Sequence, residues 1–513
     1  MTDTSADIST SQRFSHAEIV GVLWGVVLAM LMAALDQTIV ATALPTIAGQ
    51  FGQLEGMSWV VTAYLLTSTA TSPLFGKMSD LYGRKRLMQA AIALFVIGSA
   101  ACGLAQSMTQ LVMFRGLQGM GGGGLMALAF TIIADVVAPR ERGRYQGYIA
   151  GVFAISSVTG PLLGGLLTEH LSWRLIFLVN IPIGIAAYAM TNRALSRLGS
   201  GRRGHRIDYV GAALMVAAVV CLLLALTWGG SSYAWTSPVI LGLAAAALVL
   251  LALLVVQELR VPEPVLPPRM FRSRIVKLCC AAVAVTAAVM FAGIVFLPLH
   301  LQMVREVGAS NSGLMMLPMM LGVVTGSTLS GRLLTRTGRY RVVPIIGISF
   351  AAAAYGMLAA FPALPTVGYL GVLAVLGIGV GTVMPTLMTV VQNAVDRHDL
   401  GAATSAVGFF RSLGASLGIA LFGTILSGAA EAALSKRSPG VAGLDLGHVI
   451  DRGPEAVRAL PPELRQFVLA AFAHAFDTLF LVTAGLALLT AGLLLFLEEV
   501  PLRSGREAAL PPE

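Results

Sequence analysis

Long runs of apolar residues recur from about residue 18 to about residue 497, and short polar segments separate them. Most runs reach about 20 residues, the length of α-helix that crosses a bilayer core about 30 Å thick. Membrane-spanning strands need only about ten residues of alternating polarity, and these runs do not alternate. The pattern therefore predicts an all-α polytopic membrane protein.

The polar segments divide the runs into fourteen membrane-spanning helices. We expect these helices at residues 18–45, 58–76, 87–105, 110–137, 145–168, 173–192, 208–228, 237–257, 274–302, 312–333, 342–360, 367–392, 402–428 and 472–497. The polar start, residues 1–17, leads into the first helix without a small-residue cleavage site, so we expect no cleavable signal peptide.

Charge supports this interpretation and orients the helices. Charged residues make up only 12% of the chain, about half the share typical of soluble proteins. The net charge is +9, and most of the 34 Lys and Arg residues lie on alternate connecting segments, beginning with the N-terminal one. Because basic residues in short loops favour the cytoplasm, we expect a multi-pass protein of the plasma (inner) membrane with both termini cytoplasmic. Such loops face anionic lipid, so membrane lipid rather than nucleic acid explains the charge.

Two basic linkers separate the helices into three groups. We expect an N-terminal six-helix bundle in residues 1–200, and a linker with two accessory transmembrane helices in residues 201–265. A C-terminal six-helix bundle follows in residues 266–513, with a long external loop at 429–471. Repeated halves around a central site are a common transporter plan. Near the end of that loop, PPELRQFVLAAFAHAF predicts a helix that runs into the last span.

Asp36 lies inside the first predicted span and Arg115 inside the fourth, while Arg411 lies inside the thirteenth. A charge near the bilayer centre costs roughly 2.5–3.5 kcal/mol on insertion scales, so such residues usually pair or line a pathway. The depths of Asp36 and Arg115 from the outer ends of their helices are similar enough for the Arg side chain to bridge. A functional pair and a purely structural pair both remain open.

The connection between the second and third helices reads GKMSDLYGRKR and holds an acid among bases. Gly76 and Gly83 permit tight turns. We expect Asp80, Arg84 and Asp135 to form one network, because Asp135 lies at the inner end of the fourth helix. Asp80 is also expected near the N-terminus of the thirteenth helix, where the helix dipole favours an anion. The alternative is that the basic residues of this loop only orient the protein in the membrane and form no such network.

The fifth helix contains SSVTGPLLGGLL, in which small residues recur every four positions. Ser156, Gly160 and Gly164 form one stripe that lets a neighbouring backbone approach closely. Pro161 removes one helix hydrogen bond and favours a bend. A plain packing face and a moving bend use the same residues, so both interpretations stay open.

The chain shows no sequence pattern for bond-making chemistry, and an enzyme is the least favoured class. It has no nucleotide-binding P-loop, and its seven histidines form no HExxH or similar cluster. The four cysteines lie in or beside apolar runs without metal-ligand spacing. We therefore expect no metal, no cofactor and no use of ATP.

These motifs resemble those of the major facilitator superfamily. GKMSDLYGRKR is similar to its loop between helices 2 and 3, and RGLQGMGGG resembles the helix 4 motif whose Arg is associated with proton transfer. SSVTGPLLGG, with Gly160, Pro161, Gly164 and Gly165, resembles the helix 5 motif typical of antiporters. LDQTIVATALPTI and SWRLIFLVNIPIG, with fourteen spans, resemble the EmrB/QacA-type branch of drug:proton antiporters. Ala41 departs from the pattern, since the helix 1 motif usually has Asn there.

The resemblance implies a proton-coupled antiporter that exports small lipophilic or cationic compounds by alternating access, driven by the proton gradient. Asp36 would carry the proton and Arg115 would tune its pKa. An exporter of one endogenous metabolite or lipid is an alternative with the same motifs. A membrane sensor without transport activity is less favoured. The sequence leaves open whether a periplasmic adaptor protein joins the transporter.

The substrate cavity is expected to be lined by adaptable side chains. Candidates are Met315, Met316 and Met319 on the tenth helix, and Arg411 on the thirteenth. Ordinary core or lipid-facing methionines are an equally good interpretation. The tenth helix contains no acid, which weakens a claim for divalent cations.

Overall fold

The computed structural model describes residues 16–51, 57–137, 139–197, 208–230, 233–261, 264–396, 399–435 and 461–501. In this part of the chain the elements are helices, joined by short connections and without a β-strand. The residues of the expected external loop between 436 and 460 lie outside the described ranges.

Fourteen long helical units follow one another along the described chain. The first six are α1 (His16–Phe51), α2 (Met57–Tyr82), α3 (Arg84–Gly103), α4 (Met108–Val136), α5 (Pro139–His170), and α6 with α7 (Leu175–Leu178 and Asn180–Ala194). The next two are α8 (Tyr209–Trp228) and α9 (Pro238–Arg260). The last six are α10 with α11 (Arg274–Phe291 and Leu297–Met303), α12 with α13 (Ala309–Met315 and Leu317–Thr337), α14 (Val342–Ala360), α15 (Thr366–Ala394), α16 (Leu400–Ser435) and α19 (Pro462–Leu495).

Twelve of these units are long and apolar enough to cross a membrane by length and composition. The other two, α2 and α5, contain 26 and 32 residues, and pack against α4 and α1 respectively. The expected all-α architecture of two six-helix bundles and two accessory helices is confirmed. Several helices are longer than expected: α1 ends at Phe51 rather than 45, α2 at Tyr82 rather than 76 and α16 at Ser435 rather than 428, and α5 begins at Pro139 rather than 145. The helix predicted at the end of the external loop is present, since α19 runs without a break from Pro462 into the last span. The helices continue past the apolar runs because residues such as Ala and Glu favour helix without being buried.

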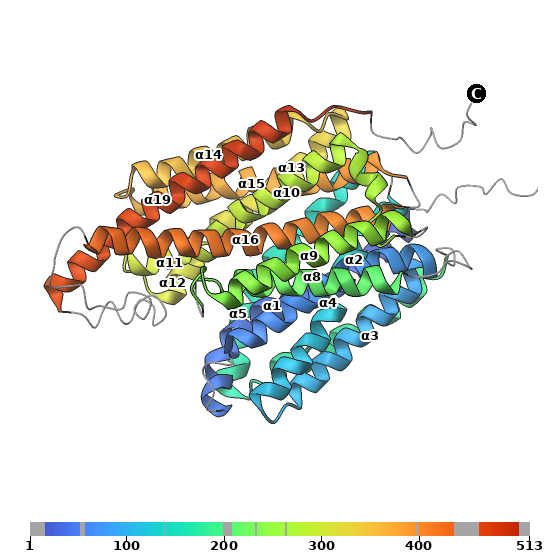
Figure 1. Cartoon of the computed structure of the whole chain (residues 1–513), viewed down its shortest axis with the longest axis horizontal. Coiled ribbons are helices and arrows are strands. Elements are labelled where there is room, and N and C mark those ends of the chain that lie inside the picture. Colours follow the sequence, from blue (N-terminus) through green and yellow to red (C-terminus); the bar gives the residue numbers. More distant parts are fainter. Residues whose placement is uncertain are drawn as a thin grey trace, which may run out of the picture.

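The buried apolar residues divide as the helices do. One large cluster comes almost entirely from α10 to α19, and two others come from α1 to α7. In a fourth cluster, α8 and α9 pack against α2. Figure 1 shows α8 and α9 running beside α16 and α2, between the two halves. The accessory helices therefore lie against the seam between the halves.

The two ends of the molecule differ in how closely the halves meet. We define the basic end as the end that holds the α2–α3 connection, the α13–α14 connection and the N-terminus of α16. Gln392 of α15 is 3.5 Å from the carbonyl oxygen of Phe130 in α4, and Ala134 of α4 packs into the C-terminal cluster. In Figure 1 the halves converge at this end and diverge toward the opposite one, where α1 ends and α19 begins.

Candidate functional site

Asp36 and Arg115 form a buried ion pair between α1 and α4. Arg115 Nη1 lies 2.5 Å from Asp36 Oδ2, and the two side chains are 2% and 0% exposed for Arg115 and Asp36. Two charges taken out of water are tolerated only when their remaining donors and acceptors are satisfied as well. The structure thus brings together Asp36 and Arg115, as their similar depths in the sequence suggested.

Neighbouring amides and a hydroxyl satisfy the rest of this pair. Gln118 Nε2 donates to Asp36 Oδ1 at 2.8 Å, while its Oε1 accepts from Arg115 Nη1 at 2.9 Å. Asn180 Nδ2 donates to Asp36 Oδ1 at 3.0 Å. The Ser99 hydroxyl accepts from both Gln118 and Asn180, each at 3.0 Å. We call these five side chains the coupling cluster; it joins α1, α3, α4 and α7.

Local structure places each member of the coupling cluster. Asn180 is the first residue of α7, where the helix is interrupted after α6, so its side chain reaches inward from a helix start. Gly98 lets α3 approach α4 closely, since an added Cβ there would lie 2.7 Å from the backbone nitrogen of Gln118. The Arg115 guanidinium lies 4.3 Å from the centroid of the Tyr64 ring on α2, a favourable cation–π arrangement. It also donates to the carbonyl oxygen of Val60 at 3.3 Å.

Sequence reasoning missed the uncharged members of this cluster. Gln118 and Asn180 lie inside the quoted motifs RGLQGMGGG and SWRLIFLVNIPIG, and Ser99 lies in a predicted span. The available signal was a lone amide within an otherwise apolar run. Such a residue stands out less than a charge because its insertion cost is smaller.

A second network lies at the basic end, around Arg84. Its Nη1 is 2.5 Å from Asp80 Oδ1, and its Nε is 2.6 Å from Asp135 Oδ2. Gly83, which turns the chain from α2 into α3, has φ of 93°, a conformation that favours glycine. The structure therefore assembles the expected network of Asp80, Arg84 and Asp135.

Asp80 also connects this network to the other half of the molecule. The backbone N–H groups of Gly401 and Ala402 each donate to its carboxylate at 3.3 Å. These donors belong to the first turn of α16, where the helix dipole favours a negative charge. Gly76 lies so close to Ser405 that an added methyl group would collide with the Ser405 hydroxyl. We call this set of contacts the basic-end gate.

The charge state of Asp80 follows from its surroundings. Asp80 lies beyond the predicted second span, which ends at residue 76. Burial raises the pKa of Asp80 to about 6, while the positive charge of Arg84 acts in the opposite direction. The carboxylate is therefore mainly ionised at neutral pH, and the basic-end gate is held by ionic as well as backbone contacts.

The glycine stripe of α5 packs against α1. A Cβ on Gly160 would collide with the Thr38 hydroxyl, and a Cβ on Gly164 would collide with the Thr42 hydroxyl. The Thr38 hydroxyl donates to the carbonyl oxygen of Ser156 at 2.8 Å, which holds the two helices together. The stripe is therefore a surface of close helix contact, as its spacing indicates.

Gly165, a further residue of the α5 motif, does not contribute to this contact. An added Cβ on Gly165 would meet no atom within 4 Å, so this glycine does not provide close packing. The side chain of Pro161 lies outside the described part of α5. The close approach between α1 and α5 is thus carried by Gly160 and Gly164.

The three candidate methionines lie in or against the C-terminal core, in line with the second of the two interpretations that the sequence left open. Met319 is fully buried, and an added Cβ on Gly293 would lie 2.7 Å from its methyl carbon. Met316 is also buried in the C-terminal core, and Met315 packs against that core while partly exposed. Their directions are set by the packing of α12 and α13 onto neighbouring helices. Arg411, the fourth candidate, lies in α16 and is only partly buried.

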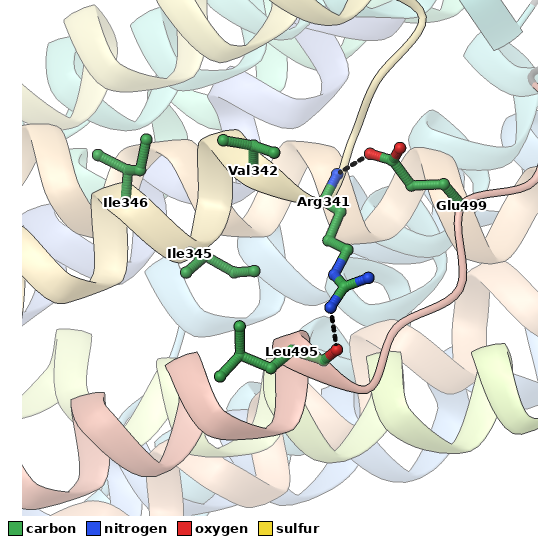
Figure 2. A pocket seen from close by; sticks show the side chains of 6 residues that line it. All are labelled: Arg341, Val342, Ile345, Ile346, Leu495 and Glu499. Atoms are coloured by element: carbon green, nitrogen blue, oxygen red, sulfur yellow. Dashed lines mark hydrogen bonds between the residues drawn. The ribbon is translucent and has the colours of Figure 1, made fainter.

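One pocket lies apart from these residues, at the basic end (Figure 2). Its volume is about 400 Å³, and it lies between the start of α14 and the end of α19. The Arg341 backbone N–H donates to the Glu499 carboxylate at 3.2 Å, and its guanidinium donates to the Leu495 carbonyl oxygen. These bonds fasten the chain after α19 to α14, and the pocket contains none of the residues predicted from the sequence.

The fold and these sites define a class of membrane transporter. The family pattern of the Major Facilitator Superfamily matches residues 26–191 and 186–419, so the chain belongs to this superfamily. An uncharacterized MFS-type transporter of Mycobacterium tuberculosis is 38% identical over 489 residues, which cover 93% of this chain and 69% of the relative.

Two other relatives carry more specific names. The multidrug transporter protein MdtP of Bacillus subtilis is 37% identical, over 79% of this chain and 74% of the relative. The acurin A biosynthesis cluster MFS-type transporter of Aspergillus aculeatus is 32% identical, over 81% of this chain and 77% of the relative. Both align over most of their own length.

Solved structures show the same fold at low sequence identity. The human organic anion transporter MFSD10 superposes with a TM-score of 0.62 at 15% identity, covering 93% of this chain and 99% of that one. The proton:xylose symporter XylE superposes with a TM-score of 0.59 at 12% identity, covering 95% and 97%. These likenesses concern the architecture alone.

The basic-end gate predicts the effect of neutralising Asp80. Asp80→Asn keeps the size but removes the charge that faces Arg84 and the first turn of α16. Losing one charge-assisted interaction costs about 1.5–3 kcal/mol, so the gate should open more often, by about tenfold or more. The readout is the rate of maleimide labelling at Ser405→Cys, a buried position, after the native cysteines are replaced. Arg86→Gln, an exposed change in the first turn of α3, is the control. Equal labelling rates in Asp80→Asn and the control would contradict the gate.

The glycine stripe gives a prediction with a matched control inside the same helix. Gly160→Ala should destabilise the protein by about 1–3 kcal/mol, because the added methyl group overpacks the contact with Thr38. Gly165→Ala adds the same methyl group where no atom lies within 4 Å, and should have little effect. Thermal unfolding in detergent measures the difference. Identical midpoints of thermal unfolding for the two variants would contradict the close contact between Gly160 and Thr38.

Proposed function

We propose that the protein is a proton-coupled antiporter that exports small lipophilic compounds by alternating access. The observation that carries this proposal is the coupling cluster, in which the Asp36 carboxylate of α1 is buried and its partners come from α4 and α7. The family supports transport, and the names of relatives such as MdtP support efflux. A buried acid in this position is suited to carry a proton across the apolar part of the protein.

Protonation of Asp36 changes what holds α1 to α4. The ionised carboxylate pairs with Arg115 and accepts hydrogen bonds from Gln118 and Asn180. A neutral carboxylic acid loses the charge attraction, while Arg115 keeps its contacts with Gln118, Val60 and the Tyr64 ring. Proton binding thus weakens one helix contact without leaving the guanidinium unsatisfied. That coupling between charge state and helix packing is what an antiporter requires.

The basic-end gate supplies the conformational part of the cycle. Its contacts between the halves include hydrogen bonds from Gly401 and Ala402 to one carboxylate, which can be broken and remade. Opening these contacts would admit a compound from the basic end, and closing them would expose it at the opposite end. Weakening of the α1–α4 contact by a proton biases this exchange.

The basic end is proposed to face the cytoplasm of a cell whose plasma membrane holds the transporter. Arg84, Lys85 and Arg86 lie there, and basic residues in short loops are retained on the cytoplasmic side. In this orientation, protons that move into the cell down their gradient drive the compound out of the cell.

This orientation predicts a labelling pattern in intact cells. An impermeant maleimide should label Leu104→Cys, an exposed position between α3 and α4 at the far end, without cell disruption. Arg86→Cys should be labelled only after the membrane is permeabilised, since it lies at the basic end. Labelling of Arg86→Cys without permeabilisation, and of Leu104→Cys only after it, would show that the basic end faces outward. That result would overturn the proposed direction of export.

The role of Asp36 has a direct test. Asp36→Asn should abolish export driven by a pH gradient in reconstituted vesicles, because the side chain keeps its size but cannot take up a proton. Insertion and folding should persist, as a neutral amide is cheaper to bury than a carboxylate. Asp396→Asn removes an exposed acid and should leave export unchanged. Undiminished uphill export by Asp36→Asn would eliminate this residue as the proton carrier.

Export of a single endogenous metabolite is the second candidate function. The relative from Aspergillus aculeatus is named for the biosynthesis cluster of one compound, acurin A, rather than for many drugs. The coupling cluster serves either role, because it does not define the substrate. A panel of chemically unrelated lipophilic compounds, tested in the same vesicles, separates broad from narrow export.

A further inference from the structure

Arg411 places a guanidinium in the middle of α16. It lies eleven residues after Leu400, which is about 16 Å along the helix axis at 1.5 Å per residue. That is about half the thickness of a bilayer core. The side chain is only partly buried, and within the residues that the structure describes it has neither a hydrogen bond nor an ion pair.

The face of α16 that carries Arg411 is directed toward other helices. Thr404 precedes it by seven residues, almost two full turns, and therefore lies on the same face. The Thr404 hydroxyl accepts a hydrogen bond from Gln392 of α15 at 3.1 Å, and that same amide is 3.5 Å from the Phe130 carbonyl oxygen of α4. Arg411 thus lies above the closed contact between the halves, on the side of α16 that faces it.

The side of α16 that faces lipid carries other residues than Arg411. Leu417 and Leu421 are 43% and 45% exposed and lie on one side of α16. Seven residues after Arg411, Gly418 packs so closely on α10 that an added Cβ would lie 2.7 Å from the Ala288 Cα atom. The Arg411 side of α16 is therefore turned into the protein and away from the apolar surface.

The other charged groups deep in the described spans are accounted for. Asp36 is paired with Arg115, so its charge is not available to a cation while that pair persists. Asp477 lies on the side of α19 that carries Leu481, which is 59% exposed, and so faces outward. His300 is buried in the aromatic core of the C-terminal half. Arg411 is thus a deep charge to which the described residues supply no charged partner.

We propose that Arg411 binds an acidic group of the transported compound, so that lipophilic organic acids are among the substrates. A guanidinium presents two parallel N–H donors that match a carboxylate, and the pair is strong where little water is present. This inference rests on the proposed transport function and narrows its substrate class. It disfavours the cationic compounds expected from the resemblance, because the described residues place no unpaired acid between the halves.

Equilibrium binding without a pH gradient tests the inference. The probes are dansyl-leucine, which has a free carboxylate, and its methyl ester, which has the same size without the charge. The protein is placed in nanodiscs of neutral phosphatidylcholine, and the dansyl fluorescence reports binding. Arg411→Gln removes the charge, Arg411→Lys keeps the charge but loses the fork of donors, and Arg336→Gln removes an exposed arginine at the basic end as a control.

The wild-type protein should bind the acid at least about tenfold more tightly than the ester, as expected for one charge-assisted pair. Arg411→Gln should abolish this preference and leave the affinity for the ester unchanged. Arg411→Lys should retain part of the preference, and Arg336→Gln all of it. If Arg411→Gln does not fold, the inference is tested by the ratio of the affinities for the acid and the ester. This ratio should be smaller for Arg411→Lys than for the wild-type protein.

Three results would overturn the inference. One is a wild-type protein that binds acid and ester equally. Another is an acid preference that survives Arg411→Gln. The third is competition between dansyl-leucine and added phosphatidylglycerol at the same site, which would assign Arg411 to a lipid headgroup. Asp36→Asn distinguishes a failure of this inference from a failure of the proposed proton coupling. This variant should lose gradient-driven export but still bind the acid more tightly than the ester.

Discussion

A carboxylate that is fully removed from water must be paired, and the pairing of Asp36 organises the N-terminal half of this protein. Arg115 supplies the charge, while Gln118, Asn180 and Ser99 supply the remaining hydrogen bonds. Four helices must keep fixed positions for these contacts to exist together. When Asp36 loses its charge, Arg115 keeps only its contacts with Gln118, Val60 and the Tyr64 ring, and the attraction between α1 and α4 is weakened. A proton is the ligand that can relieve this constraint reversibly, since it neutralises the acid without filling space.

The basic-end gate uses the same principle in a more exposed place. Asp80 belongs to the N-terminal half by sequence, yet two of its hydrogen-bond donors are backbone N–H groups of α16 in the other half. Arg84 holds Asp80 in position and also binds Asp135. The two networks lie on shared helices, because Asp135 ends the same α4 that carries Arg115. A shift of α4 therefore changes the contacts of both the coupling cluster and the basic-end gate.

Much of the fold could be predicted from the sequence because a membrane protein must bury whole apolar helices. The charges Asp36 and Arg115 were found for the same reason, since a charge in such a run is costly. The uncharged partners Gln118 and Asn180 were missed because a single amide barely changes the apolar pattern. The sequence left open whether the methionines line a cavity or pack in the core, because a run of residues does not show which side of a helix packs inward. Helix ends were misjudged where residues outside the apolar run, such as those before Ser435, still favour helix.

Export in exchange for a proton requires that binding of the compound and release of the proton are coupled, and the number of protons released on binding tests this coupling most directly. Purified protein in weak buffer is titrated with an exported compound while a pH indicator dye records free protons. We expect the wild-type protein to release protons on binding at one or more points of a pH series, and Asp36→Asn to release none. Equal release by both proteins, or binding without release at any pH, would contradict proton coupling through Asp36.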